Sequence, residues 1–267
     1  MATLIIKLIK DKRVSIIIYC AAAVFLVWMY MAMYPAIQLK MTAMNDVFQS
    51  YPEGLMKAFG IEQLVFDHLE NFLAMEQFGI IWPVMVICFM AGLASYSIAK
   101  EIESGTAEVL LARPISRLKV LGCRYLAAVL ILLAFTLLST LIVAPMAAAY
   151  NIDYVFASYV KTAMVGFLFG WAFYSASIMF SAMFSEKSKV AMSIGGVAVV
   201  MYIFKIVASL VEHLGWMKYL SFFYYFDANE VLVRGNIQAL SIIVFIGVII
   251  LCSATTAWYF QKRDIAV

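Results

Sequence analysis

The stretch KEIESGTAEVLLARPISRLKVLGCR, residues 100–124, is the longest polar interruption between the long apolar runs that is not acidic overall. It contains five of the nineteen Lys and Arg residues of the chain. Loops between membrane spans that are enriched in Lys and Arg stay on the cytoplasmic side of the membrane. This stretch therefore predicts a cytoplasmic loop and orients the apolar runs on either side of it.

The sequence predicts a short helix within this loop, over residues 106–113. Gly105 interrupts the helix that arrives from the preceding apolar run, and Thr106 can cap the next helix. Pro114 disfavours helical backbone at the residue before it, so the short helix is expected to end there. Ser116 is placed to cap the span that follows. These residues isolate about two helical turns.

One face of the short helix is apolar and its rims are charged. Ala107, Leu110 and Leu111 share a face at helical spacing, and Glu108 and Arg113 flank that face. A capped helix of this kind, held just below a membrane, is suited to entering a groove in a partner protein. An ordinary solvated loop that only orients the protein explains the same pattern, so the pattern alone leaves both interpretations open.

The composition indicates the class of protein. Apolar residues make up 66% of the 267-residue chain and charged residues only 13%, about half the charged share of a soluble domain. We therefore predict an all-α polytopic membrane protein. The four Cys and two His residues show no metal-ligand spacing, so no metal site is expected.

Six apolar runs are long enough to span a bilayer, which takes about 20 residues. They cover residues 14–37, 78–99, 125–150, 162–185, 190–211 and 235–260 of a single transmembrane domain, residues 1–267. Residues 1–13 form an amphipathic helix expected to lie along the inner membrane surface. Thirteen Lys and Arg residues fall on the side of residues 100–124 and five on the opposite side. Both termini are therefore predicted to be cytoplasmic.

Two segments on the outer side are expected to contain structure of their own. Residues 38–77 are poor in Lys and Arg, and a surface helix is predicted there from apolar residues at helical spacing: Leu64, Val65, His68, Leu69 and Phe72. Residues 206–234 mix charged residues with many aromatic ones. That mixture predicts an external, re-entrant-like hairpin that is half inserted and anchored by its aromatic rings.

Lys205 is the only charged residue well inside an apolar run. It lies sixteen residues after Lys189, so at about 1.5 Å per residue it stands near the outer boundary of the membrane. A lysine at that depth can extend to the outer headgroups. A substrate-binding lysine in a translocation pathway is the alternative interpretation.

The sequence lacks the motifs that would supply energy or chemistry. It contains no G-x-x-x-x-G-K-[ST] phosphate loop, no H-E-x-x-H and no G-x-S-x-G. No carboxylate is predicted deep within a span, which argues against a carrier driven by a proton or sodium gradient. The chain is therefore expected to have no catalytic site, and its energy must come from another protein unless it is passive.

The run EIESGTAEVLLARPISR, residues 101–117, resembles the signature loop of ABC transporter permeases of the type-two (ABC-2) exporter class. The family pattern is acidic residues, Gly-Thr, a Leu-Leu helix, and then Pro-x-Ser-Arg. The resemblance extends over most of the chain, including six spans and an aromatic hairpin before the last span. Residues 51–60 and 218–226 also resemble prokaryotic members, although Phe222 stands where the family pattern has proline.

The resemblance implies that two permease subunits, alike or related, form the translocation path above two ATP-binding subunits. Helix 106–113 would be a coupling helix seated in the ATPase, with ATP and Mg²⁺ on that partner and no cofactor on this chain. The residues implied at this interface are Glu101, Glu103, Gly105, Thr106, Glu108, Leu110, Leu111, Arg113, Pro114 and Arg117.

The resemblance also implies export across a prokaryotic plasma membrane, with lipids but no nucleic acid as further partners. The apolar, aromatic and methionine-containing spans favour an amphipathic, lipid-like or peptide cargo. A passive channel or a secondary carrier without an ATPase partner is the alternative function.

Overall fold

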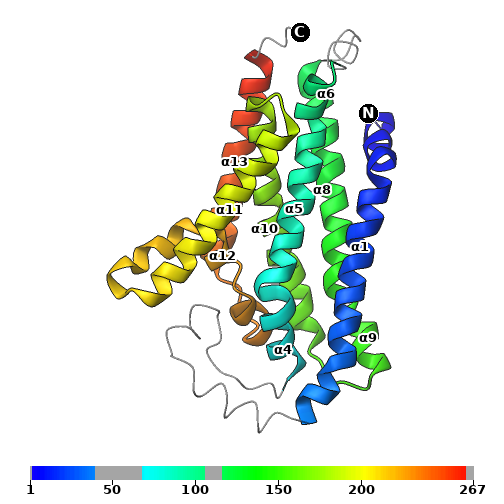
Figure 1. The fold of residues 1–267 in the computed structure, drawn as a ribbon, viewed down its shortest axis with the longest axis vertical. Coiled ribbons are helices and arrows are strands. Elements are labelled where there is room, and N and C mark those ends of the chain that lie inside the picture. The colour runs from blue at the N-terminus through cyan, green and yellow to red at the C-terminus, as the bar shows by residue number, and fades with distance from the viewer. Residues whose placement is uncertain (1, 40–67, 106–115, 263–267) are drawn as a thin grey trace.

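The computed structural model describes residues 2–39, 68–105 and 116–262, and these fold into a bundle of long helices without any strand (Figure 1). Six helices in this part of the chain are long and apolar enough to cross a membrane. They cover Thr3–Gln38, Leu69–Ser97, Arg117–Ala149, Phe156–Met183, Lys187–Leu210 and Ala239–Lys262. The prediction of an all-helical protein with six spans is confirmed for these residues.

Two of the six spans are built from more than one labelled element: Leu69–Ser97 from α4, η1 and α5, and Arg117–Ala149 from α8 and α9. The elements are α1 (Ala2–Leu39), α4 (Leu69–Glu76), η1 (Gln77–Ile81), α5 (Trp82–Ser97), α6 (Ala99–Glu103), α8 (Arg117–Leu141), α9 (Val143–Ala149), α10 (Phe156–Met183) and α11 (Lys187–Leu210). After them come η2 (Glu212–Leu220), α12 (Phe222–Tyr225), η3 (Asn229–Val233) and α13 (Ala239–Lys262).

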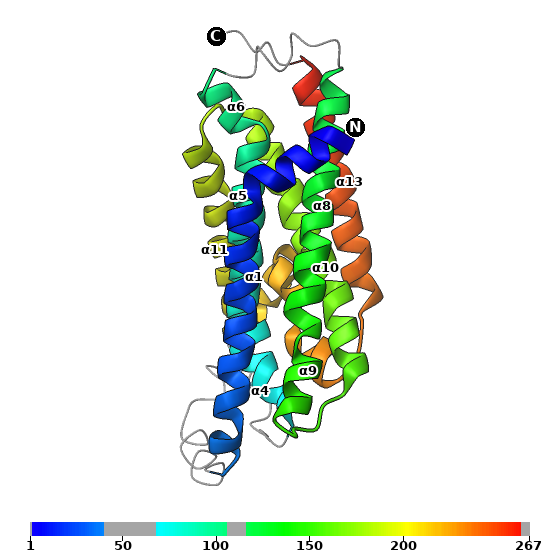
Figure 2. The ribbon, with the colours of Figure 1, turned by 90° about the vertical axis from the view of Figure 1, so that its right-hand side faces the viewer.

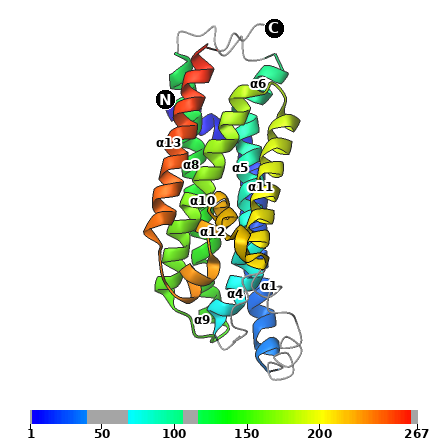
Figure 3. The same cartoon turned by 90° about the vertical axis from the view of Figure 1, so that its left-hand side faces the viewer.

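The start of α1, the end of α13, α6 and the start of α8 all lie at one end of the bundle (Figures 1 and 2). We call this the loop end, because it carries the residues that border residues 106–115. α4 and α9 lie at the opposite end. Figure 3 shows α11 and α13 at opposite edges of the bundle, with α10 and α12 between them.

The amphipathic start of the chain is part of α1 rather than a separate helix. α1 runs without interruption from Ala2 to Leu39, and Figure 2 shows its first turns inclined toward α8 before the helix follows the bundle. Leu8 on these turns is buried, whereas Lys7 and Lys10 are exposed. Leu8 is therefore covered by protein, whereas Ile6 and Ile9 on the same turns are exposed.

The prediction of a surface helix before the second span is wrong for the residues that the structure describes. Five of the eight residues of α4 are buried, including the polar Glu70, because α4 packs against η3 and α1 at its end of the bundle. Residues 64 and 65 lie outside the described ranges. α4 continues through the π-helical turn η1 into α5. This wider turn directly precedes Pro83, which lacks the N–H needed to continue an α-helical ladder.

The segment between α11 and α13 first leaves the bundle and then returns to it. Over η2 the chain projects sideways from the other helices (Figure 1). α12 then brings Phe222 and Phe223 back against α10, with ring centroids 5.2 Å from Phe173 and 5.7 Å from Phe169, respectively. The rings of Phe222 and Phe223 thus lie inside the bundle, where Phe222 also contacts Phe245 of α13, whereas Trp216 and Tyr219 of η2 are exposed.

The last span starts later than the sequence predicted. Its helix begins at Ala239 and not at Gly235, because Gly235 has a φ of +62°, a left-handed conformation that ends η3. The carbonyl of Gly235 accepts a hydrogen bond of 2.7 Å from Lys161 Nζ at the start of α10. This contact ties the connection before α13 to the neighbouring span.

α5 and α10 approach each other closely at two glycines. A Cβ atom on Gly166 would lie 2.6 Å from the Trp82 ring, and one on Gly170 would lie 2.7 Å from Leu132 and 2.8 Å from Val86. Real Cβ atoms do not make such short contacts. The Gly-x-x-x-Gly spacing in α10 therefore permits this packing, as small residues do between membrane helices.

Replacing Gly170→Ala should lower the free energy of unfolding by about 1–3 kcal/mol, because the added methyl group overpacks the contact with Val86 and Leu132. Thermal unfolding of the purified protein in detergent measures the effect. Gly247→Ala in α13 is the matched control, since no atom lies within 4 Å of its added Cβ. An equal loss in both variants would contradict the close-packing account.

Candidate functional site

A buried arginine fixes the end of α5 at the loop end of the bundle. Arg124 on α8 is only 9% exposed, and its guanidinium donates a hydrogen bond to the carbonyl of Ser97, the last residue of α5. A cation is favourable there because the carbonyls at a helix C-terminus carry a partial negative charge. The guanidinium of Arg124 thus connects α8 to the C-terminal end of α5, directly before the junction with α6.

α10 holds the same junction from the other side. The Ser181 hydroxyl donates to the carbonyl of Ala94 at 2.8 Å and accepts from the N–H of Ala99 at 3.1 Å. Helical geometry breaks between these two residues, at Ile98, with φ −131° and ψ −59°. One serine therefore satisfies a donor and an acceptor that flank the break, and α6 is set in a defined direction.

Tyr125 joins three spans through one hydroxyl group. The indole N–H of Trp171 and the hydroxyl of Ser253 donate to the Tyr125 oxygen at 2.7 and 2.9 Å, and Ser175 Oγ lies 2.6 Å away. Ser175 donates its own proton to the carbonyl of Trp171, so the Tyr125 proton is left for Ser175. α8, α10 and α13 are linked by this network, in which every partner is satisfied.

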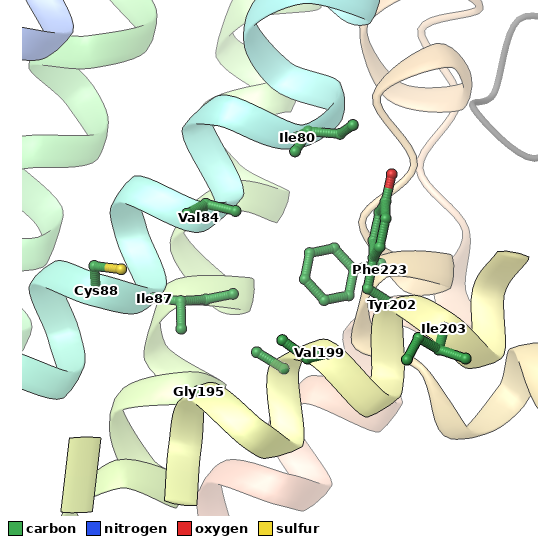
Figure 4. A pocket seen from close by; sticks show the side chains of 10 residues that line it. Ile80, Val84, Ile87, Cys88, Gly195, Val199, Tyr202, Ile203 and Phe223 are labelled. Atoms are coloured by element: carbon green, nitrogen blue, oxygen red, sulfur yellow. The ribbon is translucent and has the colours of Figure 1, made fainter. Parts of the chain in front are cut away.

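An apolar groove of about 310 Å³ lies between α5 and α11. Figure 4 shows side chains from both helices facing the space, with Phe223 of α12 at one side. The lining residues are Ile80, Val84, Ile87, Cys88, Gly195, Ala198, Val199, Tyr202, Ile203 and Phe223. No charged residue is among them, so the groove is suited to an apolar ligand or to the apolar part of an amphipathic one.

The six candidate spans agree with the protein family to which the sequence is similar. The family model described as ABC-2 family transporter protein matches residues 3–265 of this chain. The chain belongs to this family. It is therefore a multi-pass membrane protein and the permease component of a transporter, and the family works with an ATP-binding subunit instead of catalysing a reaction itself. No curated protein matches the sequence significantly.

The predicted ATPase interface of the permease lies mostly outside the described residues. This holds for residues 106–115, and therefore for Thr106, Glu108, Leu110, Leu111, Arg113 and Pro114, which stay a prediction. Glu101 lies in α6, but its side chain is also outside the described part. Gly105 ends this helical segment in the left-handed conformation, with φ +66°.

The two remaining interface residues border the predicted coupling helix. Glu103 is exposed, and its Oε2 accepts a hydrogen bond of 3.1 Å from the N–H of Lys187, the first residue of α11. Arg117 is the first residue of α8. Before the predicted coupling helix, Glu103 is thus bonded to the start of α11. After it, Arg117 already belongs to α8.

Lys205 does not line the groove of the permease. It is half-buried on α11, while the neighbouring Tyr202 and Ile203 belong to the groove lining. The interpretations of Lys205 as a pathway residue or an outer-boundary residue both stay predictions.

Sequence reasoning missed the roles of Arg124 and Tyr125. The sequence identifies Arg124 only as a basic residue of the cytoplasmic loop. In the structure its guanidinium binds a backbone carbonyl 27 residues earlier in the chain. Since every residue type carries a carbonyl, no pattern in the sequence identifies such a partner. The partners of Tyr125 likewise come from helices that only the folded permease brings together.

Removing the hydroxyl with Tyr125→Phe should lower the free energy of unfolding by about 1–3 kcal/mol, because Trp171 and Ser253 lose their common acceptor. Thermal unfolding in detergent again provides the measurement. Tyr219→Phe is the control, since Tyr219 is an exposed tyrosine of η2. Unfolding of the two variants at the same temperature would mean that the network contributes little.

Proposed function

We propose that this chain is the permease subunit of an ABC exporter, forming the translocation pathway and coupling to a separate ATP-binding subunit. The observation that carries the proposal is the family match over residues 3–265. Two permease chains, identical or related, assemble in a prokaryotic plasma membrane with two ATP-binding subunits on the cytoplasmic side. The loop end faces the cytoplasm in this arrangement, as the distribution of Lys and Arg favours.

The contacts at the loop end support a route from the ATPase to the spans. The predicted coupling helix 106–113 is flanked by α6 and α8. α6 is set against α10 by Ser181, and α8 is joined to the end of α5 by Arg124. When the ATPase pair closes and displaces the coupling helix, these contacts move α5 and α8 with it. ATP and Mg²⁺ are bound by the partner, and this chain needs no cofactor.

The groove between α5 and α11 forms one wall of the pathway in this proposal. Its lining without charged residues suits an amphipathic or lipid-like cargo, or an apolar peptide. α5 is both a wall of the groove and the helix that Arg124 fixes at the loop end. A displacement of α5 therefore changes the groove, and this connects ATP binding with the release of cargo.

The partner assignment is tested by affinity purification of the tagged protein from native membranes. We expect a protein with Walker motifs to copurify, and the variant Leu110→Asp/Leu111→Asp to lose it because charges would replace the apolar face of the coupling helix. Leu220→Asp is the control, since Leu220 is an exposed leucine of η2. Recovery of the chain as a stable oligomer without an ATPase would instead favour the passive channel or carrier.

The pathway assignment is tested by filling the groove. Ala198→Phe places a ring in the space between α11 and α5 and should reduce transport roughly tenfold, the equivalent of about 1.4 kcal/mol of cargo binding. Basal ATP hydrolysis by the complex should persist. Met192→Phe is the control on the same helix, because Met192 points away from the bundle and is 76% exposed. Unchanged transport in a folded Ala198→Phe complex would exclude the groove from the pathway.

A further inference from the structure

Two lysines from different helices meet over one tyrosine ring at the loop end. Tyr96 is half-buried near the end of α5. Lys12 Nζ of α1 lies 3.8 Å from the centroid of its ring, and Lys100 Nζ of α6 lies 4.3 Å from the same point. Each ammonium gains a cation–π interaction, but the shared ring also brings two positive charges together.

The two ammonium groups repel each other at this separation. Two atoms at 3.8 and 4.3 Å from one point cannot be more than about 8 Å apart, which is within one Debye length at physiological salt. Lys187 at the start of α11 adds further repulsion on Lys12. Among the residues that the structure describes, none of these three ammonium groups is in a salt bridge.

The nearby carboxylates already accept other hydrogen bonds. Asp11 attracts Lys12 electrostatically, but its Oδ2 accepts the hydroxyl proton of Tyr96 at 3.1 Å. Glu103 accepts from the backbone N–H of Lys187. Each ammonium group carries three N–H donors, and within the described part of the chain Lys12 and Lys100 take part in no salt bridge.

We propose that Lys12, Lys100 and Tyr96 form a binding site for the phosphate group of an anionic membrane lipid. Charge-assisted hydrogen bonds from an ammonium to an oxygen are about 2.8 Å long. A phosphate that reaches both lysines can accept one such bond from each of them through different oxygens, because the two ammonium groups are at most about 8 Å apart. Its negative charge adds to that of Asp11 in offsetting the repulsion among the described lysines.

The position of the site on α1 identifies the lipid headgroup, and not a soluble phosphate, as the source of the anion. Val14 and Ile17 follow Lys12 within about two turns and are 62% and 63% exposed. An apolar surface of this kind, on a helix long enough to cross the membrane, contacts acyl chains. Lys12 thus lies at the depth where the headgroups begin and where lysines interact with anionic lipids.

Native mass spectrometry of the full-length protein in detergent tests the site, with dioleoyl phosphatidylglycerol and dioleoyl phosphatidylcholine as probes. The protein should retain phosphatidylglycerol in preference to phosphatidylcholine. Lys12→Gln/Lys100→Gln should weaken phosphatidylglycerol binding about tenfold or more, since each lysine contributes a favourable charge contact. Lys12→Arg/Lys100→Arg should preserve it.

Lys7→Gln/Lys10→Gln is the matched control, because both lysines are exposed on the same helix and the net charge changes equally. Size-exclusion chromatography and thermal unfolding verify that each variant is folded. Equal losses in the two glutamine variants, or no loss in either, would overturn the site. Displacement of phosphatidylglycerol by millimolar inorganic phosphate would overturn the lipid as its ligand.

Discussion

The indole ring of Trp82 is the contact on which the arrangement of the spans depends. The outer end of its ring, at Cη2, lies against Gly166 of α10, and its N–H donates to Ser139 of α8 at 2.8 Å. It also stacks on Phe226, which follows α12, at a centroid distance of 5.3 Å. One side chain of α5 therefore joins two further spans and the returning segment. A large ring fits there only because α10 presents glycine at the point of closest approach.

The two faces of α5 are held by different kinds of interaction. Toward α8 and α10 it is fixed near one end by the bond from Trp82 to Ser139, and at the other by the bond from Arg124 to Ser97. Toward α11 it presents only the apolar groove, and apolar contacts allow sliding because they have no preferred direction. α11 is also the span with the smallest buried share. The boundary between these two helices is thus the part of the bundle best suited to change.

Hydropathy and charge predicted much of this architecture because the bilayer imposes a simple rule. Every backbone polar group must be satisfied within lipid, so an apolar run of sufficient length has little choice but to form a helix. The same reasoning failed where protein replaces lipid or water as the surroundings. The residues of α4 have the amphipathic pattern of a surface helix, yet even Glu70 is covered by neighbouring segments. The lysines at Tyr96 are likewise far apart in the sequence. Tertiary neighbours of this kind leave no local pattern.

The uninterrupted helix from Leu69 to Ser97 has a consequence for the thickness of membrane that the protein occupies. Glu70 lies about 40 Å along this helix from Ser97, at about 1.5 Å per residue, whereas the hydrocarbon core of a bilayer is about 30 Å thick. With Ser97 at one boundary, Glu70 stands beyond the other, among headgroups or water. Its carboxylate, which accepts the N–H of Val155 at 2.6 Å, is thus a buried charge that never has to enter hydrocarbon. In that placement the packed core extends past the hydrocarbon and holds there an acidic residue that lipid would exclude.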